Sequence, residues 1–339
     1  MMRAFLPLVL LVGAFAGSIP AAAQPALRTA SGHLDLSGVW SNASLTWLER
    51  PATLKGPTLS EAEAKARAAA DPMKMAAARD ARPSDPDAGA PPAGEGALGA
   101  AHSAIYLDAG DAFARIGGEY RTAWIVEPGD GRLPLTDFGR QSSQAAAVMR
   151  NRMNPDGPEH LAPNDRCLIG SRGSGGPGML NNIYNSNYRF LLTDDALVVI
   201  VEMGFGVRII PILKTRALAQ AAHGPAALQP WMGDSTAWWE GDTLVVETVN
   251  VHPVQGNFGP IFLSPKGRVT ERLTRATAKE IAYEFVVEDP VFYTRTWKAE
   301  MVIAALPGDI YEYACHEGNY AMPGILGGAR AADVQVAGK

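Results

Sequence analysis

The sequence predicts a mainly β protein, an antiparallel barrel (lipocalin-like) or a sandwich, with an irregular N-terminal wrap that contains one or two helices. Nine short segments rich in Val, Ile, Thr and aromatic residues lie between residues 188 and 314, and turn residues rather than helices separate them. Strands joined by short turns pair antiparallel, as in barrels and sandwiches. The expected strands are Tyr188–Leu192, Ala196–Met203, Val207–Ile212, Ser235–Trp239, Thr243–Val249, Val269–Arg275, Ile281–Val287, Thr294–Ile303 and Ile310–Ala314.

Tight turns are expected where two polar or glycine-containing pairs interrupt this pattern. Asp194-Asp195 and Gly241-Asp242 are residue pairs typical of hairpin connections. No GxGxxG follows a strand and no P-loop is present, so nucleotide-binding folds are disfavoured.

The N-terminal half has a different character and predicts few regular elements. Ser60 and Glu63 form a capping box that opens an Ala-rich helix to about Ala70. Residues 79–101 are Pro, Ala, Gly and Asp with almost no large apolar residue, which predicts a disordered surface loop. The remaining expected elements are a short strand at Leu34–Trp40, a strand at Arg121–Val126, a turn at Pro128–Gly131 and a helix at Gln141–Arg152.

The first 23 residues resemble a secretory signal peptide. Arg3 supplies the charge, Ala4–Gly17 is apolar, and Ala21-Ala22-Ala23 is a cleavage site. We therefore expect a periplasmic or secreted protein, cleaved after Ala23, without a membrane anchor. The chain then divides into a signal peptide (1–23), an irregular region (24–180) and an antiparallel β core (181–330) that forms one domain with the region before it.

Composition narrows the classes of partner. The 339 residues are 47% hydrophobic and carry a formal net charge of −5, so a core is available and nucleic acid is not an expected partner. The sequence contains no HxH, HExxH or clustered Cys and His, so we expect no metal site. We expect no cofactor, and a small organic molecule as the partner.

Two cysteines, Cys167 and Cys315, are present. In an oxidising compartment such a pair is naturally a disulfide, here closing a loop of 148 residues. The alternative is two buried free thiols.

The segment Tyr311–Tyr320 concentrates polar chemistry, with a thiol, an imidazole, two carboxylates, an amide and three phenols in ten residues. His316 is the best candidate for acid–base catalysis, because imidazole titrates near neutral pH. Glu317 and Tyr320 would orient it. The alternative is that His316 is a structural hydrogen-bonding residue.

A second candidate pair lies at a predicted turn. Glu202 ends an apolar run, so its carboxylate needs a partner, and Arg208 across the Gly204–Gly206 turn is the expected one. Either the two form a structural ion pair, or they bind substrate or tune an acid–base group.

Aromatic residues accompany further charges. Trp239 faces away from Trp238 and Glu240 if the strand alternates, so one tryptophan can line an interior. Asp234 precedes that strand among large aromatics and is a candidate catalytic acid. Alternation would also place three residues on one face, suited to a planar or anionic ligand, or simply packed together. These residues are Tyr293, Arg295 and Trp297.

A glycine-rich loop, Ser171–Gly178, follows no strand–helix pattern and no GxSxG elbow is present. We interpret the loop as a mobile flap or a backbone-mediated contact.

Four stretches together resemble a large, mostly uncharacterised family of secreted proteins of Proteobacteria and Acidobacteria. They are Leu36–Trp40, Asp165–Cys167, Gly233–Thr248 with its W-E-G-D-T-L-V-V motif, and Tyr311–Arg330 with Y-A-C-H-E-G-N-Y-A-M. The chain departs from the family pattern at Thr236–Trp238, where a small residue and Arg usually precede the tryptophan. The resemblance implies one β-rich exported domain in which these motifs matter.

These features lead to a functional hypothesis with two rivals. The leading one is a cofactor-independent enzyme that performs lyase- or isomerase-like proton transfer, or hydrolysis, on a small aromatic or polycyclic molecule. His316 would act as acid or base, Arg208 and Arg295 would anchor oxygen atoms, and Trp239 and Trp297 would form apolar walls. The rivals are a non-catalytic periplasmic, lipocalin-like carrier and a structural envelope protein.

Overall fold

A computed structural model describes residues 28–80, 87, 108–150, 155–168, 173–257, 259–317 and 319–337. The expected signal peptide and nearly all of the loop expected at 79–101 lie outside these ranges. Residues 169–172, which include the first two residues of the glycine-rich loop, and Phe258 also lie outside them.

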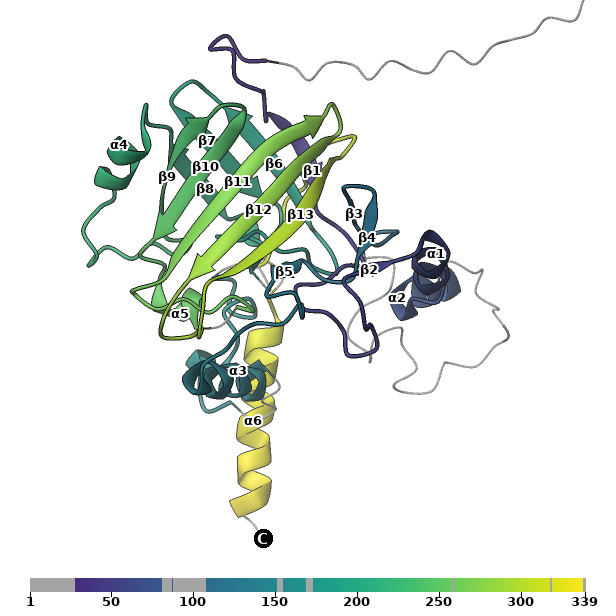
Figure 1. Cartoon of the computed structure of the whole chain (residues 1–339). Helices are drawn as coiled ribbons and strands as arrows, with labels where there is room; N and C mark the ends of the chain where they lie inside the picture. Colours follow the sequence, from purple (N-terminus) through teal and green to yellow (C-terminus); the bar gives the residue numbers. More distant parts are fainter. Residues whose placement is uncertain are drawn as a thin grey trace, which may run out of the picture.

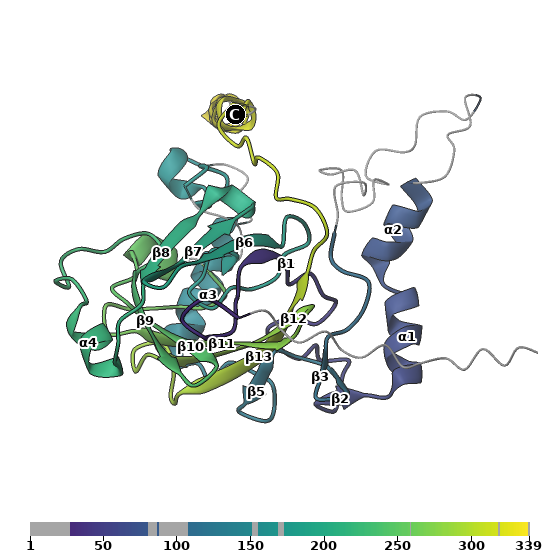
Figure 2. The same cartoon turned by 90° about the horizontal axis from the view of Figure 1, so that it is seen from above.

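Nine antiparallel strands form one sheet that curls into a barrel, in the spatial order β8-β7-β6-β1-β13-β12-β11-β10-β9 (Figure 1). Seen from above, the two ends of this sheet approach each other (Figure 2). The strands are β1 (Gly38–Ser41), β6 (Asn187–Leu192), β7 (Ala196–Val201), β8 (Val207–Pro211), β9 (Asp234–Glu240), β10 (Thr243–Val249), β11 (Arg268–Thr277), β12 (Glu280–Glu288) and β13 (Trp297–Ala305).

The odd number of strands determines how the barrel closes. Neighbours in the order alternate in direction, so the first and last strands, β8 and β9, run parallel and cannot form an antiparallel ladder. A single parallel bridge joins Ile212 to Ala237, and the Leu213 amide donates to the Ala237 carbonyl at 2.7 Å. Within the described residues, no other backbone bridge joins these strands. We call this junction the seam.

Strand alternation fills the barrel. In β12 every second residue, from Ile281 to Val287, is buried, and β13 shows the same pattern from Trp297 to Ile303. The register sets Tyr283 opposite Met301, so large side chains meet across the sheet. The largest buried side chains form one core cluster, which includes Trp40, Trp124, Tyr188, Phe190, Phe285 and Trp297.

The N-terminal region wraps the barrel and also contributes to it. β1 inserts between β6 and β13, and β5 (Ile125–Glu127) adds to the side of β13. The other elements here are a small sheet of β2 (Thr58–Leu59), β3 (Arg115–Ile116) and β4 (Glu119–Arg121), with helices α1 (Glu61–Ala69), α2 (Pro72–Asp80) and α3 (Asp137–Arg150). The expected capping box of Ser60 and Glu63 is present at α1.

The predicted class, a mainly β antiparallel barrel with few helices, is confirmed. Eight of the nine predicted strands form, the ninth is absent, and β7 ends at Val201 rather than Met203. Residues 310–314 are not a strand, because the chain leaves the sheet after Leu306 and finds no strand partner. Residues 294–296 are also irregular, so β13 begins only at Trp297. The single strand expected at Arg121–Val126 is divided between β4 and β5.

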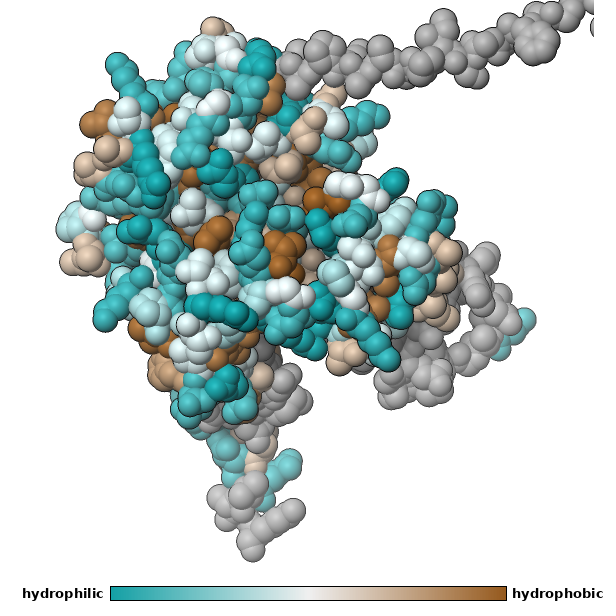
Figure 3. Space-filling view, in the orientation of Figure 1, coloured by the Kyte–Doolittle hydropathy of each residue, from teal (hydrophilic) through white to brown (hydrophobic). Residues whose placement is uncertain are grey.

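The outer surface of the barrel is polar over β10 to β13, where apolar side chains are scattered among hydrophilic ones (Figure 3). Helix α4 (Arg216–Ala221) covers part of β9 from outside, and the short helix α5 (Pro253–Gly256) lies at the barrel end that also carries α3 (Figure 1). None of the helices in the described ranges has the length and apolar character needed to cross a membrane.

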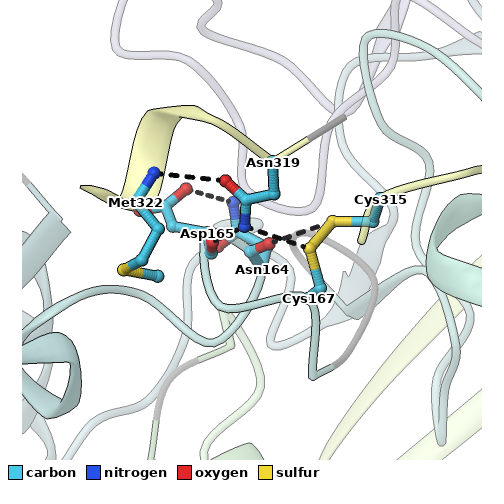
Figure 4. The surroundings of a disulfide bond; sticks show 6 residues. All are labelled: Asn164, Asp165, Cys167, Cys315, Asn319 and Met322. Carbon is cyan, nitrogen blue, oxygen red and sulfur yellow. Dashed lines mark hydrogen bonds between the residues drawn. A yellow bond between two sulfur atoms is a disulfide. The ribbon is translucent and has the colours of Figure 1, made fainter. Parts of the chain in front are cut away.

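After β13 the chain runs down the outside as a C-terminal arm, residues 306–337, ending in helix α6 (Ala321–Ala337). The expected disulfide, Cys167–Cys315, ties this arm to the 155–168 segment, and the Asn319 side chain bonds Asp165 and Cys167 (Figure 4). Arg330 donates to the carbonyls of Pro155 and Asp156. A disulfide is typical of proteins in oxidising compartments.

Reduction of the disulfide should release the arm while the barrel stays folded, because all nine barrel strands pair without it. We expect limited proteolysis of Cys315→Ser, or of reduced protein, to cut within residues 306–320 much faster than in the oxidised protein. The far-ultraviolet spectrum of the strands should be unchanged. Loss of strand structure on reduction would contradict this.

Candidate functional site

A fully buried ion pair crosses the seam inside the barrel. Arg208 lies on the inner face of β8, since Val207 and Ile209 point outward and are exposed. Its guanidinium reaches Glu271 on β11, with Nη1–Oε1 at 3.1 Å and Nη2–Oε2 at 2.5 Å. Nη2 also donates to Ser235 Oγ on β9 and Thr248 Oγ1 on β10, both at 3.2 Å. One side chain therefore connects β8 to three strands on the other side of the seam.

Two buried tyrosines extend this network to a segment that closes one end of the barrel. We call this segment, Gly173–Asn182, the strap; all of its residues except Gly173 are buried. Tyr283 Oη donates to Glu271 Oε1 at 2.6 Å and accepts from the Met179 amide at 2.8 Å. Tyr188 Oη donates to the Ser174 carbonyl at 2.9 Å. The two tyrosines therefore hold the strap through hydrogen bonds to its backbone atoms.

The electrostatics of the network fix the protonation states. Burial tends to raise the pKa of Glu271, but the charge and hydrogen bonds of Arg208, with those of Tyr283 and Gly178, lower it below its ordinary value. Burial lowers the pKa of Arg208, but Glu271 outweighs it and the pKa is raised. Burial raises the pKa of Tyr188, and burial together with Glu271 raises that of Tyr283. The pair is ionised and both phenols are neutral at neutral pH.

A small cavity lies beside this network, which we call the strap cavity. It measures about 10 Å³, enough for one water molecule. It is lined by Gly173, Gly176, Pro177, Val251, Gln255, Gly256, Gly259, Ile261 and Leu263. Gly176 separates the cavity from the ion pair, because a Cβ there would lie 2.7 Å from Arg208 Nη1. Gly176 has a φ of +79°, a conformation that also favours glycine.

One buried polar atom without a hydrogen-bond partner belongs to the lining of the strap cavity, and two more belong to residues next to that lining. Within the described residues, Gln255 Oε1, Ser174 Oγ and Arg208 Nε find no partner. Gln255 lines the cavity, Ser174 lies between two strap glycines, and Arg208 contacts Gly176. Unpaired buried polar atoms are destabilising in folded proteins. Because Gln255, with its unpaired Oε1, lines the strap cavity, we take this cavity as the candidate site.

The expected pairing of Glu202 with Arg208 is wrong. The register sets Arg208 beside Val199, while Glu202 lies beyond the end of β7. Glu202 instead accepts hydrogen bonds from the side-chain amides of Asn185 and Asn187, at 2.9 and 2.7 Å. Only Arg208 of these two belongs to the candidate site.

Asp234 lies on the outer face of the barrel, away from Arg208. Its carboxylate accepts from the Gly224 amide at 2.7 Å and lies 3.2 Å from His223 Nδ1. His223 Nε2 is 3.4 Å from Glu247 Oε1, so one histidine bridges two carboxylates beneath the α4 region. This cluster was not predicted, because the pairing of β9 with β10 is what brings Asp234 and Glu247 to the same face.

The aromatic residues do not line an open hollow. Trp239 is on the inner face, as expected for one of the two tryptophans, and stacks on His33 at 4.2 Å. Tyr293 and Trp297 are buried in contact, with ring centroids 5.6 Å apart. Arg295 is exposed, so the expected shared face of Tyr293, Arg295 and Trp297 does not form, because the chain between them is not a strand.

The C-terminal residues lie on the arm, outside the barrel. His316 and Glu317 are exposed, and Tyr320 is 84% exposed. The structure does not bring them together with Arg208, Arg295 or the tryptophans. The proposed catalytic set therefore does not surround one shared volume.

Within the described residues, no group of three or more His, Cys, Asp or Glu side chains is arranged to hold a metal ion. Comparison with known proteins adds no constraint on function: no protein-family model, no curated protein and no solved structure matches this chain.

Removing one partner of the buried pair should destabilise the protein strongly. We expect Glu271→Gln to cost about 3–5 kcal/mol of the free energy of unfolding, because it leaves the Arg208 charge uncompensated. The matched control is Glu240→Gln, which breaks the half-exposed pair of Glu240 with the neighbouring Arg272 and should cost at most about 1 kcal/mol. If urea denaturation shows equal losses of unfolding free energy in the two variants, Arg208–Glu271 does not act as a buried ion pair.

The same pair should make the free energy of unfolding depend on pH in the acidic range. The pKa of Glu271 is lower in the folded than in the unfolded state, so its contribution is complete above the unfolded value of about 4.3 and is lost as the pH falls below it. The double variant Arg208→Met, Glu271→Leu lacks this contribution. Between pH 6 and 3 its free energy of unfolding should fall less steeply than that of the wild type, and parallel curves would refute the linkage.

Proposed function

We propose that this protein binds a small organic molecule at the strap cavity and does not transform it. The observation that carries this proposal is the buried, unpaired Oε1 of Gln255 in the cavity lining, with unpaired atoms also on the adjoining residues Ser174 and Arg208. Barrels of this size commonly hold one small ligand in or near the barrel mouth. A ligand that completes these hydrogen bonds would offset the cost of leaving them unmade.

Binding fits the chemistry of this site better than proton transfer does. A general acid or base works best with a pKa near the operating pH. Here the pKa of Glu271 is lowered and those of Tyr188 and Tyr283 are raised, so each moves away from neutrality. His316, the candidate acid or base, is exposed on the C-terminal arm. The non-catalytic carrier is therefore preferred over the proton-transfer enzyme.

A ligand larger than water requires part of the strap to move. Residues Gly173–Pro177 include three glycines and no large side chain, while Met179 and Leu180, which anchor the strap in the core, lie beyond them. The Ser174 carbonyl accepts one hydrogen bond from Tyr188. Displacing these five residues would open the cavity toward Arg208 and leave Met179 in place.

The lining indicates the class of ligand. Val251, Ile261 and Leu263 provide apolar contact, and the unpaired atoms offer an acceptor at Gln255, a donor at Arg208 and a hydroxyl at Ser174. A flat aromatic molecule that carries a carboxylate or carbonyl and one hydrogen-bond donor satisfies both requirements. The disulfide and the signal-like N-terminus support a periplasmic or secreted site of action.

An aromatic anion tests this proposal. We expect 1-anilinonaphthalene-8-sulfonate to bind the wild type with one saturable site and to be displaced by aromatic carboxylic acids. Gln255→Leu and Gly259→Leu, which remove the amide and fill the cavity, should each weaken binding by about tenfold or more, equal to about 1.4 kcal/mol. Gly259 has room for a side chain, since its nearest non-neighbouring atom would lie 3.4 Å from a Cβ.

The control addresses binding to apolar surface elsewhere. Ile209 is 69% exposed on the outside of β8, so Ile209→Glu removes an external apolar contact without touching the cavity. Binding that survives Ile209→Glu and is lost in both cavity variants supports the proposal. Binding that is unchanged in both cavity variants rejects it.

A further inference from the structure

The seam is closed unevenly along its length. Within the described residues its one backbone bridge joins Ile212, just after the end of β8, to Ala237 in the middle of β9. At Arg208 and Ser235, within the described residues, no backbone bridge joins β8 to β9. There the wall consists of side chains, chiefly Arg208, which donates to Ser235 and Thr248.

Met232 fills the remaining gap at that end. It precedes β9 and is partly buried. Its sulfur would lie 2.8 Å from a Cβ at Gly175 of the strap and 3.1 Å from one at Gly206, the residue before β8. The thioether thus occupies a notch between two glycines, one of which lies two residues before Arg208.

The residues on either side of Met232 are held in place, so its side chain is the part that can move. Trp231 stacks on His252 at 4.2 Å. Gly233 has a φ of +78°, and a Cβ there would lie 2.6 Å from Thr248 Cγ2 and 2.8 Å from the Val249 carbonyl. Methionine has three rotatable bonds and adapts to irregular gaps, so it can swing out of a notch at small cost.

We propose that this open end of the seam is a lateral portal to the barrel interior and that Met232 is its gate. Rotation of Met232 uncovers the notch between Gly175 and Gly206, behind which lie Arg208 and the strap. Small organic molecules reach the strap cavity by this route. The identity of these molecules rests on the proposed function, whereas the portal itself rests only on the seam and Met232.

The experiment uses the absence of free thiols, since both cysteines of the chain form the disulfide. Ser235→Cys places one thiol behind Met232, and its rate of modification by a small uncharged thiol reagent is measured in the full-length oxidised protein. We expect Met232→Ala to raise this rate by about tenfold, equal to a decrease of about 1.4 kcal/mol in the free energy of opening. Met232→Leu, which keeps the volume, should leave it near the wild-type rate.

Two controls distinguish opening of the portal from a general increase in access to the barrel interior. Met301→Cys places a thiol in the interior on β13, away from the seam, and its rate should not respond to Met232→Ala. Met73→Ala removes a partly buried methionine of α2 and should change neither rate. Equal acceleration of both interior thiols, or no acceleration at Ser235→Cys, overturns the portal. Neither outcome depends on a ligand, so failure of the proposed binding function is detected separately by the dye experiment.

Discussion

The buried Arg208–Glu271 pair is the interaction on which the rest of the structure depends. Nine antiparallel strands place two parallel strands at the junction, and a parallel pair with one bridge cannot supply a continuous backbone ladder. The guanidinium crosses this gap and reaches three strands at once. A buried ion pair is often no more stabilising than well-packed apolar side chains. Its value here is geometric, because directed hydrogen bonds define the distance and register across the seam.

The same pair also organises the barrel end. Glu271 positions Tyr283, and Tyr283 together with Tyr188 holds the strap through backbone atoms, so strap residues need no large side chains. Glycines can then approach the guanidinium closely, as Gly176 does. This polar attachment leaves a small cavity beside the network, and its lining includes Gln255 with an unpaired side-chain oxygen. The candidate site is therefore a consequence of how the barrel closes.

Much of the fold could be predicted from the sequence, whereas much of the site could not. Local signals such as alternation, turn pairs and the Ser60–Glu63 capping box identified the class and eight strands. The partner of Arg208 was missed because Glu271 is distant in the chain and only strand register brings it near. Its inward position could be read from the alternation of Val269, Glu271 and Leu273. The density of polar residues around His316 suggested a catalytic site, but it belongs to an exposed disulfide-linked arm, since residues 310–314 pair with no strand.

Side chains, rather than backbone pairing, close the seam at Arg208. Hydrogen–deuterium exchange of Glu271→Gln against the wild type tests this at the level of single strands, under conditions where both remain folded. Amides of β8 and β9 should lose protection first and most, while those of β12 and β13 should retain it. Uniform loss of protection over all nine strands, or unchanged protection at β8 and β9, would contradict closure of the seam by side chains.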